Sequence, residues 1–321
     1  MSAGEPKPRN YVRRLLSRPE EKVEEHLNQI ASGRGWRIYA GVKLTAVVDP
    51  KPPGVNTREW YETATRQHLD FVVTDEGRVP QFVVELDDPT HRRPDAVRRD
   101  RIKDAVLESA GIEVLRIETR HLNRLDDGRS LVEYLVDARD FTTAYEDAQE
   151  QGLIFRDEWP DYRLVISAGP GGISFDNDLA MEARKACFLA HKAGKTKTMY
   201  PGCGNFYWKD GWAEGWAWLE VKADRYLFTD VRLRSYHFRC SVGPGELAED
   251  LAVAAIGRDL QGFLAGTALL LPTSEITKKF DRMAHRRDDV EEITGFPFGE
   301  RTATYHSCEW PPSCAALHPL S

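Results

Sequence analysis

The chain has 321 residues, of which 41% are hydrophobic and 30% are charged. Such values are typical of an ordinary globular protein, and the length favours two domains over one. A net charge of −7 argues against a uniformly basic surface that coats nucleic acid, although it allows a local basic patch.

Nothing in the sequence indicates a membrane protein or a secreted one. No run of about 18 apolar residues is present, and the N-terminal stretch "MSAGEPKPRNYVRR" has no apolar segment behind its basic residues. The odd number of cysteines, 5, suits a reducing compartment better than a disulfide framework. We therefore expect a cytoplasmic protein without a membrane partner.

The first half of the chain predicts an alternation of helices and strands. A Ser17-x-x-Glu20 capping box opens an amphipathic helix. The further expected elements are a strand over 36–44, a hairpin of two strands over 68–88 that turns at 75–77, a helix over 94–111, a strand over 112–118 and a helix over 130–138. This order predicts an α/β sandwich with a central mixed sheet.

The pattern changes between residues 141 and 160, where the sequence is polar and ends in a Trp-Pro pair. We therefore predict one domain over 1–145 and a second over 155–321. In the second, strands are expected over 161–168, 215–223, 225–233 and 236–242, and helices over 179–194, 245–266 and 273–292. These elements predict an α+β domain.

Three acidic residues of the first domain fall on the two strands of the predicted hairpin. Glu85 and Asp87 share one face of their strand, because side chains alternate along a strand, and Asp70 lies on the partner strand. Carboxylates held close together repel one another unless a cation or a proton lies between them. A divalent metal that prefers oxygen ligands, Mg²⁺ or Mn²⁺, is the natural occupant of such a site.

Several segments in this order carry a resemblance to a known superfamily. They are "HLDFVV", "FVVELDDPTH" and "RRDRIKDAVLESAGIEVLRIE", within residues 17–120. This part of the chain resembles the PD-(D/E)xK, or restriction-endonuclease-like, nucleases, and more narrowly a bacterial branch related to the very-short-patch-repair endonucleases. The resemblance implies metal-assisted hydrolysis of phosphodiester bonds, with DNA as the preferred substrate by analogy.

The resemblance assigns roles to individual residues. Asp70 matches the first metal-binding aspartate and Glu85 the second acid, while Asp87 stands where the superfamily usually has its lysine. Lys103, on the following helix, is the candidate replacement for that lysine, because it shares a helix face with Asp100. His91 and Arg99 are alternative stabilisers of negative charge.

Other residues matched by the resemblance are Glu20 on the first helix, with Glu21 and Glu24 as alternatives, and the histidines His68 and His91 beside the acidic strands. Glu20 has a simpler role as the partner in the capping box. Asp87 has one as a turn residue at the end of a strand.

The basic residues after the acidic strand are candidate contacts for the phosphate backbone. They are Arg92, Arg93, Arg98, Arg99 and Arg101. Phosphate contacts supply much of the affinity for nucleic acid. The alternative is a solvated helix face in which arginines pair with neighbouring aspartates.

The second domain offers weaker signals. The glycines of "AGPGGISF" match no complete phosphate-binding loop and favour a tight hairpin. Tryptophans at 208, 212, 216 and 218 fit base stacking or, more commonly, core packing. His306, Cys308, Cys314 and His318 have a spacing unusual for zinc.

The sequence thus predicts a metal-dependent endonuclease domain joined to a targeting or sensing domain. One alternative is a nuclease fold that binds DNA as a scaffold without cleaving it, since the strand lysine is missing. Another is a protein whose second domain binds a small ligand or a partner. A protein partner or a homo-oligomer is left open.

Overall fold

The structure is a computed structural model that describes residues 15–49, 61–62, 64–87, 94–165, 167–169, 172–174 and 177–294. The chain forms two compact units, residues 1–123 and residues 124–321. The division falls earlier than the predicted boundary between residues 145 and 155.

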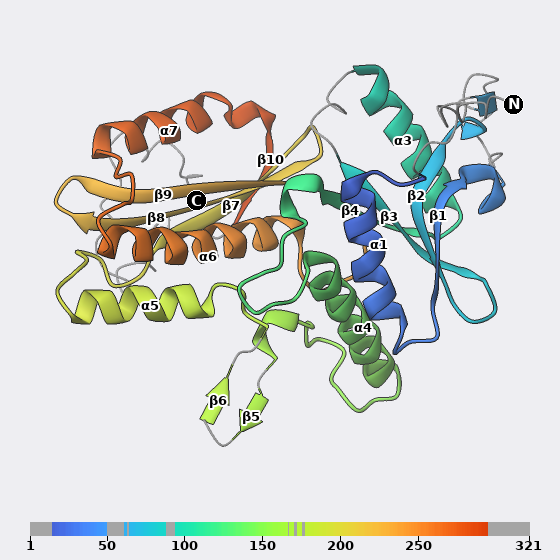
Figure 1. Ribbon diagram of the computed structural model, residues 1–321, viewed down its shortest axis with the longest axis horizontal. Coiled ribbons are helices and arrows are strands. Elements are labelled where there is room, and N and C mark those ends of the chain that lie inside the picture. Colours follow the sequence, from blue (N-terminus) through green and yellow to red (C-terminus); the bar gives the residue numbers. More distant parts are fainter. Residues whose placement is uncertain are drawn as a thin grey trace, which may run out of the picture. The chain divides into compact units, whose positions relative to one another are not determined.

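The first unit is built around a mixed sheet with the strand order β1-β2-β3-β4. Its elements are α1 (Arg18–Ala31), β1 (Arg37–Lys43), η1 (Leu44–Ala46), β2 (His68–Thr74), β3 (Pro80–Asp87), α3 (Pro94–Ser109), β4 (Glu113–Glu118) and η3 (Thr119–His121). The first three strands are antiparallel neighbours, whereas β4 runs parallel to β3. A parallel neighbour needs a crossover, and α3 supplies it (Figure 1).

Local signals in the sequence account for the ends of these elements. Ser17 and Glu20 form the predicted capping box at the start of α1. The β2–β3 hairpin turns through residues 75–79, with Arg78 at a φ of 65°. Gly111, with a φ of 69°, follows α3 in the left-handed conformation that glycine adopts at little cost.

One part of the core of the first unit lies between α3 and one face of the sheet. Ile102 and Val106 of α3 pack with Val72, Val83 and Val114, one from each of the three strands that follow β1. The register aligns Val72 with Val83 and Val83 with Val114, so these side chains share a face. The same face carries the acidic residues of β3, since side chains two positions apart point the same way.

The second unit contains an antiparallel sheet with the order β10-β7-β8-β9 and a separate hairpin of β5 and β6. Its elements are α4 (Leu131–Glu150), η4 (Tyr162–Leu164), β5 (Ser167–Gly169), β6 (Gly172–Ser174), α5 (Met181–Lys192), β7 (Gly202–Trp208), β8 (Trp212–Lys222), β9 (Arg225–Arg234), α6 (Pro244–Leu264), α7 (Thr273–His285), η5 (Arg287–Asp289) and β10 (Val290–Thr294). Helices α6 and α7 lie on opposite faces of the sheet (Figure 1).

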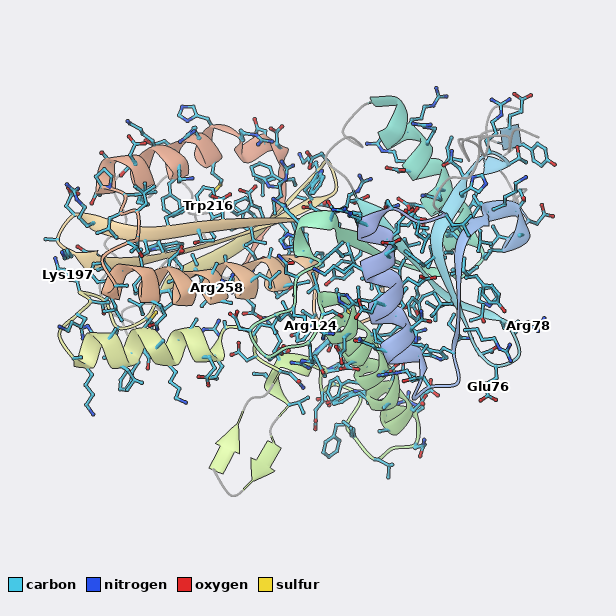
Figure 2. All side chains as sticks on the ribbon, viewed as in Figure 1. Glu76, Arg78, Arg124, Lys197, Trp216 and Arg258 are labelled. Atoms are coloured by element: carbon cyan, nitrogen blue, oxygen red, sulfur yellow. The ribbon has the colours of Figure 1, made fainter. Side chains whose placement is uncertain are left out.

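Alternation along β8 explains this three-layer arrangement. Ala217 and Leu219 pack toward α5 and α6, whereas Trp216 and Trp218 pack toward α7. The ring centroid of Trp216, labelled in Figure 2, lies 5.0 Å from that of Phe280 in α7. The tryptophans at 208, 216 and 218 are therefore core residues, as aromatic side chains commonly are.

The structure confirms the α/β class, the predicted elements of the first unit up to β4, and an α+β second unit. The glycine-rich segment forms the expected hairpin. Four expectations were wrong: residues 141–150 continue α4 as helix, residues 162–164 of the strand predicted over 161–168 form the 3-10 helix η4, residues 236–242 form no strand, and residues 290–292 belong to strand β10 rather than to a helix. The four residues considered for zinc lie outside the described residues.

No helix in the part of the chain that the structure describes is both long and apolar enough to cross a bilayer. The described cysteines, Cys187, Cys203 and Cys240, are all free thiols.

Candidate functional site

The β2–β3 hairpin brings Asp70 and Glu85 together. The register pairs Phe71 with Val84, so the next position along the antiparallel strands places Asp70 opposite Glu85. Oδ2 of Asp70 also accepts a hydrogen bond of 2.8 Å from the backbone N–H of Leu86. This bond ties the carboxylate of one strand to the backbone of the other.

Glu85 and Asp87 lie under α3, each with only 4% of its surface exposed. A buried carboxylate is costly unless it is paired or hydrogen-bonded. Two basic side chains, which are themselves buried, meet this need. One comes from α3 and the other from β4.

Lys103 of α3 is the first of these bases. Its Nζ donates to Oε2 of Glu85 in an ion pair buried on both sides. Lys103 was expected on the helix face of Asp100, and Glu85 was expected to bind the metal. In the structure, Lys103 reaches Glu85. Asp100 is also buried, at 6% exposure.

Arg116 of β4 is the second base, a residue that no sequence pattern predicted for this site. It is the register partner of Glu85 in the parallel β3–β4 pair. Its Nη1 lies 3.6 Å from Oδ1 of Asp87, and its Nη2 donates to Asp104 of α3. These neighbouring carboxylates raise the pKa of Arg116 against the opposing effect of burial. Arg116 thus links the sheet to the helix that covers it.

The pKa of Glu85 reflects the burial and the charges around it. Burial raises the pKa of Glu85 to about 7, Lys103 opposes that rise, and Asp70 adds to it. Oε1 of Glu85 has no hydrogen-bond partner among the described residues, although the atom is buried. Oε1 therefore lacks the hydrogen bond that a buried carboxylate oxygen needs.

The chemistry of the cluster suits a divalent cation with oxygen ligands. Four carboxylates (Asp70, Glu85, Asp87 and Asp104) lie around the two bases Lys103 and Arg116. Mg²⁺ and Mn²⁺ prefer carboxylate oxygens. In the conformation described, however, no three His, Cys, Asp or Glu side chains among the described residues are grouped to hold a metal ion. Ion pairs with Lys103 and Arg116 engage Glu85 and Asp87 instead.

The other predicted site residues are more dispersed. The side chain of Glu20 accepts a hydrogen bond of 2.5 Å from the backbone N–H of Ser17, so it serves the capping box. His68 is exposed on β2. On α3, the arginines Arg98, Arg99 and Arg101 are exposed. His91, Arg92 and Arg93 lie outside the described residues.

Comparison with known proteins matches the same part of the chain. Residues 12–135 match the model of a family described as "Protein of unknown function (DUF2726)". The chain is also similar to the uncharacterized protein y4bI of Sinorhizobium fredii (strain NBRC 101917 / NGR234), with 28% identity over 125 residues, which are 38% of this chain and 86% of that protein. No solved structure matches the chain. The similarity thus extends over the first compact unit and the beginning of the second.

Proposed function

We propose that the first unit is a metal-dependent nuclease that hydrolyses phosphodiester bonds, with DNA preferred over RNA. The observation that carries the proposal is the meeting of Asp70, Glu85 and Lys103 at one point of the sheet. Two acids and a lysine are what the PD-(D/E)xK resemblance implies, although the lysine here comes from helix α3 and Asp87 stands at its usual place on the strand. The mixed sheet is also the kind of sheet that the resemblance implies.

Asp70 and Glu85 would hold the Mg²⁺ or Mn²⁺ ion through their carboxylate oxygens. The bound ion would supply polarisation of the scissile phosphate and a lower pKa for a water molecule. Once released from Glu85, the Lys103 ammonium would stabilise the negative charge that develops on the phosphate. Arg116 would keep Asp87 in place, and the exposed arginines of α3 would contact the backbone phosphates of the substrate.

The test is an assay of the purified full chain on supercoiled plasmid and on single-stranded DNA, with Mg²⁺ or Mn²⁺. We expect Asp70→Ala and Glu85→Ala to abolish divalent-dependent cleavage, because each removes a metal ligand. Glu76→Ala is the matched control, since Glu76 is an exposed carboxylate at the tip of the same hairpin (Figure 2). Wild-type cleavage rates in both site variants would show that the site is misplaced.

The role of the arginines is tested separately by binding. The measured quantity is the slope of log affinity for duplex DNA against log salt concentration. Replacing Arg98 and Arg101 by neutral residues should make this slope less steep by about 0.9 for each phosphate that the two arginines contact in the wild type. An unchanged slope would make this side of α3 a solvated surface.

A second candidate is a nuclease fold that binds nucleic acid without cleaving it. The engagement of Glu85 by Lys103 favours this reading, because the metal must displace a lysine already in place. Lys103→Met separates the two candidates. In a nuclease, the variant should bind Mn²⁺ at least as tightly as the wild type by calorimetry, while cleavage falls by a factor on the order of 10². A wild type that binds the metal and never cleaves would establish the scaffold function.

A further inference from the structure

The segment that follows α4, residues 151–164, exposes large apolar side chains. Leu153 is 75% exposed, Phe155 76% and Trp159 90%. The other tryptophans in the described part of the chain are buried or half-buried. Single exposed apolar residues are ordinary, but three large ones within seven positions indicate a surface that another molecule covers.

Hydrogen bonds to α4 hold this segment in a defined conformation. Nε2 of Gln149 donates to the carbonyl oxygens of Phe155 and Glu158, both at 2.8 Å. The hydroxyl of Tyr145 donates to Oε2 of Glu158 at 3.2 Å. The backbone N–H of Leu153 donates to the carbonyl of Ala148 at 2.9 Å.

Because the backbone is already fixed, the aromatic side chains are presented at a low further cost in conformational entropy. Tryptophan is the residue type most enriched among those that dominate protein interfaces, and large rigid rings lose little freedom on binding. A fixed backbone also reduces the ordering cost that association normally carries. The segment thus has the properties of a preformed anchor.

The charge around these side chains selects the class of partner. Between residues 144 and 160 the acids are Glu146, Asp147, Glu150, Asp157 and Glu158, whereas Arg156 is the single base of the segment. Arg239 pairs with Glu146 from outside the segment, so five acids face two bases. Such a surface repels nucleic acid and anionic lipid headgroups. It also disfavours a second copy of the same surface, because acids would then face acids. A partner with basic side chains around its apolar contacts would be attracted.

We propose that this segment, with Phe155 and Trp159 as anchors, docks a protein partner through a basic amphipathic helix. The apolar face of the helix would cover the two rings, and its lysines or arginines would lie against the acids between residues 144 and 160. This interaction does not depend on the nuclease proposal, since it uses residues of the second unit alone.

The test uses two fluorescent 18-residue amphipathic peptides. One has leucine on its apolar face and lysine on its polar face, and the other has glutamate in place of every lysine. Affinities for the full chain are measured by anisotropy at two salt concentrations. We expect the lysine peptide to bind at least tenfold more tightly than the glutamate peptide and to weaken as salt rises. The double variant Phe155→Ser/Trp159→Ser should lose at least tenfold in affinity for the lysine peptide.

Leu269→Ser is the control, since Leu269 is 83% exposed elsewhere in the second unit. It should bind the lysine peptide as the wild type does. Because the substituted side chains are exposed, the variants should keep the wild-type thermal midpoint. Equal affinity of the double variant, or equal affinity for both peptides, would overturn the proposal. So would a wild-type dimer in sedimentation equilibrium that the double variant abolishes, because the covering molecule would then be a second copy.

Discussion

Replacing Glu85 with glutamine should stabilise the metal-free protein at alkaline pH. Burial raises the pKa of Glu85 from its ordinary value of 4.5 to about 7, even with Lys103 opposing the rise. The folded state therefore holds a proton on Glu85 more tightly than the unfolded state does. The stability associated with this proton is fully present below pH 4.5 and is lost as the pH rises through 7.

The size of the effect follows from the two pKa values. Each pKa unit corresponds to about 1.4 kcal/mol, so the interval from 4.5 to about 7 corresponds to about 3 kcal/mol of lost stability at pH 8. Glutamine has the shape of the neutral carboxyl group and cannot ionise, so Glu85→Gln avoids the loss. For a unit of this size the gain corresponds to a rise in melting temperature on the order of 10 °C.

The assay is thermal unfolding of wild type and Glu85→Gln in the presence of a chelator, at pH 4 and at pH 8. The two proteins should differ little at pH 4, and the variant should melt at the higher temperature at pH 8. Glu108→Gln is the control, because Glu108 is exposed on α3. Added Mg²⁺ should raise the melting temperature of the wild type at pH 8 and should have little effect on the variant.

The reasoning would be refuted by a Glu85→Gln variant that is less stable than the wild type at pH 8. Glu85 would then be stabilising as an anion, and the cluster would need no additional cation.

Three further predictions concern stability. Arg116→Leu should lower the free energy of unfolding in urea by about 3–5 kcal/mol, because it removes the buried cation that faces the buried carboxylate of Asp87. Arg120→Leu is the control and should cost less than about 1 kcal/mol, because the Arg120 side chain is half exposed. Gly215→Ala should destabilise the second unit by about 1–3 kcal/mol, since its methyl group would lie 2.2 Å from the backbone of α6. Gly262→Ala is the control in that helix: its methyl group would make only ordinary contacts with Thr267 and Ala268, so the change should be neutral or stabilising by up to about 1 kcal/mol. Burial raises the pKa of Asp250 to about 7, so the wild type should lose stability as the pH rises from 4 to 7. Asp250→Asn should not show this loss, and urea midpoints measured at the two pH values compare the two proteins.

Local patterns were sufficient to predict most of the first unit. The capping box of Ser17 and Glu20 is present, and both strands of the β2–β3 hairpin are where the two apolar runs beside the turn at 75–77 predicted them. Lys103 was the candidate replacement for the lysine that the resemblance implies, chosen because it shares a helix face with Asp100, and its Nζ reaches Glu85. In these cases the residues that decide the structure are close together in the sequence.

Where distant segments decide the structure, the sequence was less informative. Strand β10 forms because Val290–Thr294 pairs with β7, and nothing in its own composition distinguishes it from the end of the preceding helix. Arg116 is a charged residue within the short apolar strand β4, and that interruption was the available signal for a buried ion pair. Its importance depends on the parallel register with β3, which a sequence pattern does not reveal.

The parallel pairing of β3 and β4 also has a kinetic consequence. The β2–β3 hairpin joins neighbouring segments, whereas β4 begins at Glu113, 26 residues after β3 ends at Asp87. Contacts between distant residues form late, because a long loop must first be closed. Glu85 and Asp87 should therefore remain hydrated in a preformed hairpin until α3 and β4 dock, and the cost of removing that water should fall on the last step of folding.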